Sequence, residues 1–222
     1  MRGKNYEKME QQARELFLQA DQDEILRTWQ LEADERWIYV DFISQQLKID
    51  RATAEIAVPE PGSGSEALAS QDAGREALGG STYNRSMVLF DILTRTGTRP
   101  RPSGSWASIS MLGGHIGANH DRTLRNEPQA ARFAGQTQHL RLACEALGGR
   151  PESKADVGYS IPVFGDLRVL FQFWDADDEF PASIKYLFDA NALQFMHYET
   201  LWYLMGAVYS RIESCFEAAA AD

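Results

Sequence analysis

Two stretches near the end of the chain are rich in β-branched and aromatic side chains, and a short acidic segment separates them. The first is Leu167–Trp174 and the second is Ser183–Asp189. This composition is typical of β-strands. An antiparallel hairpin with Trp174 opposite Ser183 would gather apolar side chains on one face, and a shift of one residue would spoil both faces. The sequence therefore predicts a single register.

This register assigns a cross-strand partner to most side chains of the hairpin. One face carries three apolar pairs, and the other carries a charged, an apolar and a polar pair. The first face pairs Val169 with Phe188, Phe171 with Tyr186, and Phe173 with Ile184; the second pairs Arg168 with Asp189, Leu170 with Leu187, and Gln172 with Lys185. We expect Arg168 and Asp189 to form an ion pair.

Periodicity elsewhere predicts a mixture of helices and short strands. Asp21 followed by Glu24 resembles a capping box, which indicates the start of a second helix. We expect helices near 5–20, 21–29, 66–78, 83–95, 121–133, 136–147 and 198–216, and strands near 36–44, 47–50 and 54–58. The predicted fold class is α+β: one mainly antiparallel sheet, built from N-terminal and C-terminal meanders, with helices packed on one face.

The length of 222 residues fits one or at most two domains. With 44% hydrophobic and 24% charged residues, the composition excludes a wholly disordered, collagen-like or rod-like chain. We expect a single α+β domain over residues 1–222, with a flexible connector or loop at the sequence PEPGSGS near 59–65.

Other sequence signals exclude several classes of protein. The N-terminal residues lack the apolar core of a signal peptide, and no uncharged apolar run approaches the roughly 18 residues of a membrane helix. Cys144 and Cys215 are too few thiols for an iron–sulfur cluster or an all-thiolate zinc site, and we expect both to be reduced and buried. These signals predict a cytoplasmic protein.

The distribution of charge along the chain is more informative than its total. A net charge of −10 disfavours nucleic acid and anionic membranes as partners. Residues 75–141, however, carry nine arginines against four acidic residues, a net of +5, between flanks of −7 and −8. Arginine presents a planar donor fork to carboxylates and phosphates. These arginines either pair with the acidic flanks or bind an external anion.

A glycine-rich turn, GGHIG at 113–117, lies within this arginine-rich segment and precedes a predicted helix at Asp121. Backbone amides at such a turn, with Arg122 and Arg125 in the first helical turn, can bind an anion. The segment lacks the GxGxxG and Walker patterns, so a simple tight turn is the alternative. The candidate anion site comprises Arg95, Arg99, Arg101, Gly114, His115, Arg122 and Arg125.

The segment between the two hairpin strands places four carboxylates within five positions. Hard cations such as Mg²⁺ or Ca²⁺ bind clustered oxygen ligands, and mutual repulsion would raise some of the pKa values, as suits an acid–base group. The alternative is a solvated turn in which one acid caps the backbone. The four histidines show no HExxH or HxH spacing and favour structural or surface roles. The candidate metal site comprises Asp175, Asp177, Asp178 and Glu179.

Several short segments are distinctive when taken together: WDADDEFPA at 174–182 with LFD at 187–189, GSW at 104–106, LGG at 112–114, and LGG at 147–149 ahead of Asp156. In them the chain resembles the bacterial and archaeal family catalogued as domain of unknown function 3786, most strongly from Gly104 onward. Ile109 and the His115-Ile116 pair depart from the aromatic residues of the family pattern. The family has no established activity, and its members occur mostly in anaerobes. The resemblance implies a shared fold and an anaerobic setting.

Together these observations favour a cytoplasmic, non-catalytic binding or accessory module that binds an anionic small molecule or an acidic partner through the arginine-rich segment. The alternative is a metal-assisted enzyme that uses the acidic turn at 175–179. No cofactor is predicted, apart from the divalent metal of that alternative. The aromatic face of the 198–216 helix is either deeply buried or a contact between subunits of a homo-oligomer.

Overall fold

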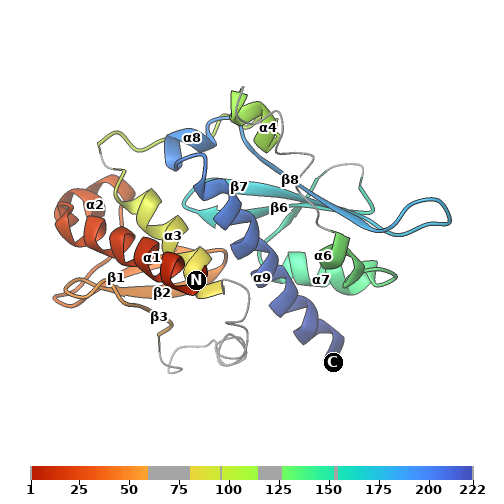
Figure 1. Cartoon of the computed structure of the whole chain (residues 1–222), viewed down its shortest axis with the longest axis horizontal. Helices are drawn as coiled ribbons and strands as arrows, with labels where there is room; N and C mark the ends of the chain where they lie inside the picture. Colours follow the sequence, from red (N-terminus) through yellow and green to blue (C-terminus); the bar gives the residue numbers. More distant parts are fainter. Residues whose placement is uncertain (1, 60–80, 96, 115–126, 153–154, 222) are drawn as a thin grey trace. The chain divides into compact units, whose positions relative to one another are not determined.

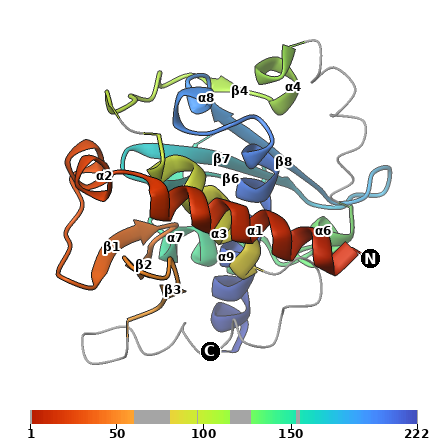
Figure 2. The ribbon, with the colours of Figure 1, turned by 60° about the vertical axis from the view of Figure 1, so that its left-hand side comes forward.

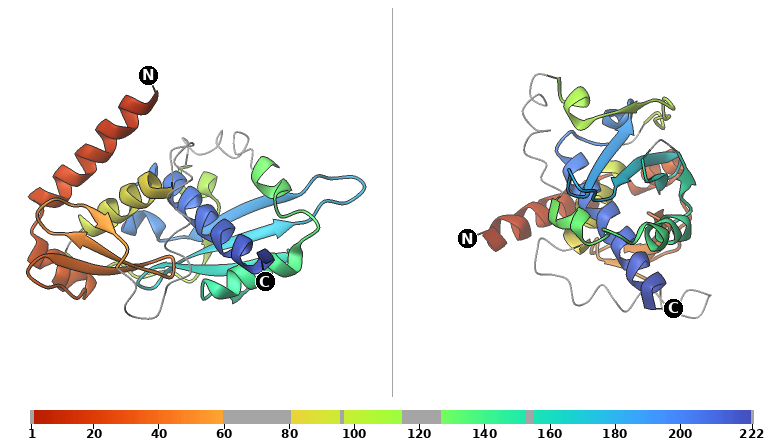
Figure 3. Two further views of the ribbon diagram at one scale, coloured as in Figure 1. Left: turned by 90° about the horizontal axis from the view of Figure 1, so that it is seen from below. Right: turned by 90° about the vertical axis from the view of Figure 1, so that its right-hand side faces the viewer.

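A computed structural model describes residues 2–59, 81–95, 97–114, 127–152 and 155–221 (Figure 1). The predicted hairpin is present as strands β7 (Leu167–Trp174) and β8 (Ser183–Asp189). Trp174 is opposite Ser183 and Val169 is opposite Phe188, so the predicted register is confirmed. Figure 3 shows the β7–β8 turn extending past the neighbouring strands.

The hairpin forms the centre of a five-stranded antiparallel sheet with the order β4-β8-β7-β6-β5. The long strand β6 (Val157–Phe164) pairs with β7 along nearly its whole length. The two edge strands, β4 (Trp106–Ala107) and β5 (Arg150–Pro151), contain two residues each. Short edge strands limit unwanted pairing with other chains.

One face of this sheet is the apolar core of its part of the molecule. Its side chains are at most 7% exposed, because helices α6 (Glu127–Ala131), α7 (Thr137–Ala146) and the later part of α9 (Thr200–Ala221) cover them. The ring of Phe133, just after α6, lies 6.2 Å from that of Phe173 and 4.9 Å from that of Phe216. The face consists of Val157, Tyr159, Ile161, Val163, Val169, Phe171, Phe173, Ile184, Tyr186 and Phe188.

A second antiparallel sheet consists of β1 (Trp37–Phe42), β2 (Gln45–Asp50) and β3 (Ile56–Ala57), in that order. It confirms the N-terminal meander. Helices α1 (Arg2–Gln19) and α3 (Ser81–Leu93) lie side by side, with the buried rings of Phe17 and Phe90 5.2 Å apart (Figure 2). Helix α2 (Gln22–Trp29) begins as predicted, because the Asp21 carboxylate accepts the Glu24 N–H at 3.0 Å.

The chain packs as two compact units. One comprises Met1–Pro100 with Gln194–Ala207, and the other comprises Arg101–Leu193 with Val208–Asp222. The α+β class is confirmed, but the expected single sheet is wrong, since the two meanders form separate sheets. The separation has a physical reason: each meander has its own helices over its apolar face. The single domain over 1–222 stays a prediction.

Three further elements complete the described fold: α4 (Ile109–Leu112), α8 (Ala192–Phe195) and the long helix α9. Two aromatic side chains of α9, Tyr203 and Tyr209, are half-buried and have ring partners within the chain. Tyr203 lies 5.4 Å from Tyr83, and Tyr209 lies 5.7 Å from Phe133. The homo-oligomeric contact through this helix stays a prediction.

Several expectations lie outside the described residues: most of the 59–65 connector, the 66–78 helix and the 121–126 part of the 121–133 helix. Cys144 and Cys215 are free and buried, as expected, and burial raises the pKa of both thiols. Among the helices in the described part of the chain, none combines the length and apolar character that a membrane crossing requires.

Candidate functional site

A cavity of about 320 Å³ lies between helix α7 and the β5–β6 hairpin. Its volume falls at the lower end of the range for small-molecule sites, about 300–1,000 Å³. Its lining combines a guanidinium, two carboxylates and a phenol with apolar and backbone surface. The lining residues are Arg141, Pro151, Glu152, Ala155, Asp156, Val157, Gly158 and Tyr159.

The turn after α7 positions these groups. Gly148 has a φ of 64°, a conformation that glycine adopts without strain. The N–H of Gly149 then donates to the carbonyl of Cys144 at 2.9 Å, and the chain reverses into β5. A Cβ at Gly149 would lie 2.5 Å from that carbonyl oxygen, so this close approach requires glycine. β5 then pairs with β6 through Pro151 opposite Tyr159.

Arg141 is the cation of the cavity, and it belongs to the arginine-rich segment recognised in the sequence. Its Nη2 donates to the backbone carbonyl of Asp156 at 2.6 Å. Glu145 lies one helical turn further along α7 but accepts the hydroxyl of Tyr159 at 2.8 Å. Burial, followed by this hydrogen bond, raises the pKa of Tyr159 to about 12. Arg141 itself forms no ion pair with any residue in the described ranges.

The two carboxylates of the cavity each accept one hydrogen bond from a neutral donor. The indole Nε1 of Trp106 donates to Glu152 at 3.0 Å, and the backbone N–H of Asp175 donates to Asp156 at 2.9 Å. The second bond ties the start of the acidic turn to the cavity wall. The sequence predictions gave Glu152, Asp156 and Tyr159 no role in a site. The period-two alternation of large apolar residues at 157, 159, 161 and 163 is a signal for the strand that carries Tyr159, but it does not single out the two carboxylates.

Arg168 lies on the other face of the sheet, and the predicted ion pair between Arg168 and Asp189 is wrong. The guanidinium donates to the carbonyls of Gly148 at 3.0 Å and Ser160 at 2.5 Å. Burial, followed by the nearby charge of Arg150, lowers its pKa. The Asp189 carboxylate instead accepts three backbone N–H groups, because the chain entering β4 and the turn after β8 both converge on it. The donors are Ser103, Gly104 and Asn191, at 2.8–2.9 Å.

None of the predicted anion-site residues that the structure describes lines this cavity. The Arg95 guanidinium lies 3.6 Å from the Asp91 carboxylate. The same carboxylate accepts the backbone N–H of His197 at 2.7 Å and the hydroxyl of Thr200 at 2.5 Å. It also lies 2.6 Å from Nδ1 of the His197 ring. Arg99 donates to the side-chain oxygen of Gln30 at 3.2 Å.

The rest of the predicted set is divided between exposed and undescribed positions. Arg101 is exposed, and its carbonyl accepts the Asn191 amide. Gly114 has a φ of 54°, and a Cβ there would have no atom of the described residues beyond its chain neighbours within 4 Å. His115, Arg122 and Arg125 lie outside the described residues.

The acidic turn uses its carboxylates as backbone caps. Asp175 accepts the N–H of Gly135 at 2.9 Å, and Asp177 accepts those of Glu179 and Phe180 at 2.9 and 2.7 Å. The expected rise in pKa through repulsion is wrong for Asp177, because these two N–H groups lower its pKa. Asp178 and Glu179 are exposed. Within the part of the chain that the structure describes, no three His, Cys, Asp or Glu side chains are arranged to hold a metal.

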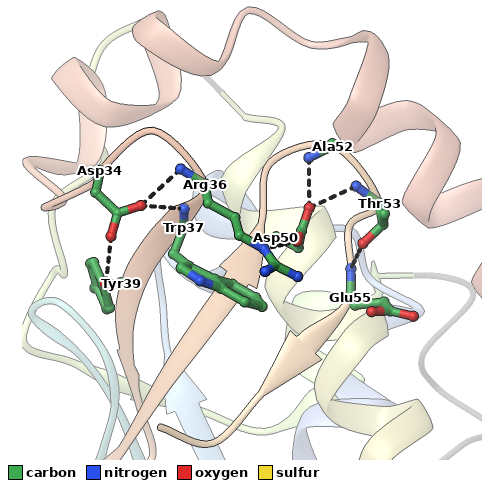
Figure 4. Close-up of polar contacts among 8 residues, drawn as sticks. All are labelled: Asp34, Arg36, Trp37, Tyr39, Asp50, Ala52, Thr53 and Glu55. Carbon is green, nitrogen blue, oxygen red and sulfur yellow. Dashed lines mark hydrogen bonds and ion pairs between the residues drawn. The ribbon is translucent and has the colours of Figure 1, made fainter.

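A second polar cluster, at the open end of the β1–β2 hairpin, has a structural explanation (Figure 4). Asp34 accepts the backbone N–H groups of Arg36 and Trp37 and the hydroxyl of Tyr39, at 2.7–2.8 Å. The Tyr39 bond first, and then the backbone bonds, lower the pKa of Asp34. Asp50 accepts Arg36 Nε at 2.9 Å, and its other oxygen caps the turn that follows β2. These carboxylates hold the ends of the meander.

A comparison with protein-family models matches residues 21–211 to a family described as a domain of unknown function, DUF3786. The chain belongs to this family. The match contains both sheets and the lining residues of the cavity, and it leaves all of α1 and the end of α9 outside. No curated protein and no solved structure matches the chain.

Proposed function

We propose that this DUF3786 chain is a non-catalytic binding module that takes a small molecule with an anionic group into the cavity between α7 and the β5–β6 hairpin. Arg141 supplies the positive charge. The observation that carries the proposal is an arginine that lines a ligand-sized cavity and forms no ion pair with a residue in the described ranges.

Two further features support this location. The guanidinium is oriented by the Asp156 carbonyl, a neutral acceptor that does not compensate its charge. Arginine also binds carboxylates and phosphates in a bidentate manner, which adds orientation to affinity. By contrast, Arg95 and Arg132 have carboxylate partners at Asp91 and Glu213 respectively.

Thermal melting with propionate and inorganic phosphate as probes tests the proposal. A ligand at about ten times its Kd adds about 1.4 kcal/mol to the native state. For a chain of this length that raises the Tm by roughly 3–6 °C. We expect Arg141→Gln to abolish the shift and Arg27→Gln, on the exposed surface of α2, to retain it. Equal shifts in Arg141→Gln and the native chain would overturn the proposal.

The same experiment separates this cavity from the loop that the sequence favoured. Loss of the shift in Arg101→Gln, with the shift preserved in Arg141→Gln, would move the binding site to the loop before β4. An acidic protein partner, a cytoplasmic location and a metal-assisted reaction at 175–179 stay predictions. Addition of Mg²⁺ or Ca²⁺ with an Asp178→Asn variant tests the last of these. A metal-dependent rise in Tm that this variant loses would support it.

A further inference from the structure

The cavity that holds Arg141 also contains two carboxylates that form no ion pair with a described residue, although the charge of Arg168 acts on one of them, Glu152. Glu152 accepts only the Trp106 indole among described groups, and Asp156 accepts only the backbone N–H of Asp175. Each bond engages one oxygen of its carboxylate and comes from a neutral donor. Neither side chain forms an ion pair with a residue in the described part of the chain.

This arrangement places opposite charges around one small volume. Among the described residues, the wall of this cavity of about 320 Å³ has one guanidinium and two carboxylates, a net charge of −1. A ligand with only negative charge would meet Arg141 but would also be repelled by both carboxylates. A ligand that also carries a cationic group would neutralise them.

The size of the cavity limits what lies between the two ligand charges. Pro151 and Ala155 have small side chains, Gly158 contributes backbone, and the Val157 side chain is buried. A volume of about 320 Å³ leaves room for a short spacer between an anionic and a cationic group.

We infer that the ligand is a small zwitterion of the amino-acid type, with its carboxylate on Arg141 and its ammonium group between Glu152 and Asp156. This inference rests on the proposed function, because it takes the anionic group of the ligand to be bound by Arg141. It adds the second charge, the short carbon spacer and the two residues that recognise the cation.

Isothermal titration calorimetry at low ionic strength tests the inference with glycine, β-alanine and γ-aminobutyrate. These probes differ only in the spacing between their two charges. Propionate and ethylamine serve as the two halves of the zwitterion. We expect at least one zwitterion to bind about tenfold or more tightly than either half, since both ends then contribute to one binding event.

The variants separate the two ends of the ligand. Arg141→Gln should reduce the affinity for the zwitterion to that for ethylamine and abolish propionate binding. Glu152→Gln and Asp156→Asn should each weaken the zwitterion about tenfold and leave propionate unchanged or tighter. Both changes keep an oxygen that can accept the existing bond from Trp106 or Asp175, so the fold is preserved, as far-UV circular dichroism would verify.

The possible failures of the two proposals differ. Propionate binding that depends on Arg141, with no zwitterion bound more tightly, would overturn the zwitterion and leave the anion site intact. Ethylamine binding that is unchanged in Arg141→Gln, without any propionate binding, would overturn both. No saturable binding of any of the five probes would also overturn both.

Discussion

Replacing Gly149 with alanine should destabilise the chain more than its modest change in size suggests. The new Cβ would lie 2.5 Å from the carbonyl oxygen of Cys144 and 3.0 Å from Cδ1 of Ile161. Because the closest atom belongs to the backbone of α7, no side-chain rotation relieves the overlap. Overpacking of this kind costs about 1–3 kcal/mol, and displacement would also break the bond from the Gly149 N–H to Cys144, worth about 1 kcal/mol.

The expected loss is therefore about 2–4 kcal/mol, which lowers the Tm of a chain of this length by roughly 5–15 °C. Thermal melting followed by circular dichroism measures it. Gly135→Ala is the matched control, because its φ of 72° brings about 1–2 kcal/mol of backbone strain, while no described atom beyond its chain neighbours lies within 4 Å of the new Cβ. Ile161→Val in the Gly149→Ala background should restore little. A Gly149→Ala chain as stable as Gly135→Ala, or one rescued by Ile161→Val, would refute the backbone overlap.

Three other predictions address the core, the caps and the response to acid. Phe171→Ala should cost about 3–5 kcal/mol in urea unfolding, because that ring is fully buried, whereas Phe180→Ala at a 66% exposed ring should cost less than about 0.5 kcal/mol. Asp91→Ala should lower stability by about 1–2 kcal/mol in thermal melting, because Asp91 accepts the N–H and hydroxyl groups that precede and begin α9. The hydrogen bond from Arg36, together with backbone N–H groups, lowers the pKa of Asp50 from its ordinary value of 3.8. The ionised Asp50 carboxylate therefore stabilises the fold above pH 3.8, and this contribution is lost as the pH falls through the lowered pKa. Asp50→Asn should therefore destabilise the chain at pH 7, and its difference from the native chain in urea unfolding should shrink as the pH falls below 3.8.

The β7–β8 hairpin could be predicted because its register depends on side chains that are near in sequence. Only one pairing of Phe171 and Phe173 with β8 places both rings in the core, and a slip by one residue exposes them. The rest of the sheet was harder to predict. β6 alternates correctly, but Gly158 and Pro162 interrupt its β-forming composition, and β4 and β5 are too short to show any period.

The roles of the carboxylates in the acidic turn depend on backbone N–H groups that no residue pattern reveals. Four carboxylates within five positions suggest mutual repulsion, yet two backbone N–H groups lower the pKa of Asp177, and Asp175 accepts a backbone N–H from outside the turn. Gly135, which donates to Asp175, is 40 residues away in sequence. A pattern of side chains predicts where carboxylates gather, but their pKa values also depend on which amides the fold directs at them.

The arginine-rich segment shows how little the position of a charge in the sequence says about its availability. Arg132 forms ion pairs with Glu213, at 2.7 Å, and with Glu217, and both acids belong to the acidic C-terminal flank. The hydrogen bond to Glu217 raises the pKa of Arg132. Arg141 has a closer candidate in Glu145, at the spacing that commonly forms a helical ion pair. In the structure the Glu145 carboxylate instead accepts a hydrogen bond from the Tyr159 hydroxyl. Ion pairing within the chain therefore accounts for Arg132, whereas Arg141 has no ion-pair partner among the described residues. The Tyr159 hydroxyl that donates to Glu145 comes from β6, so the sequence of α7 alone could not reveal it.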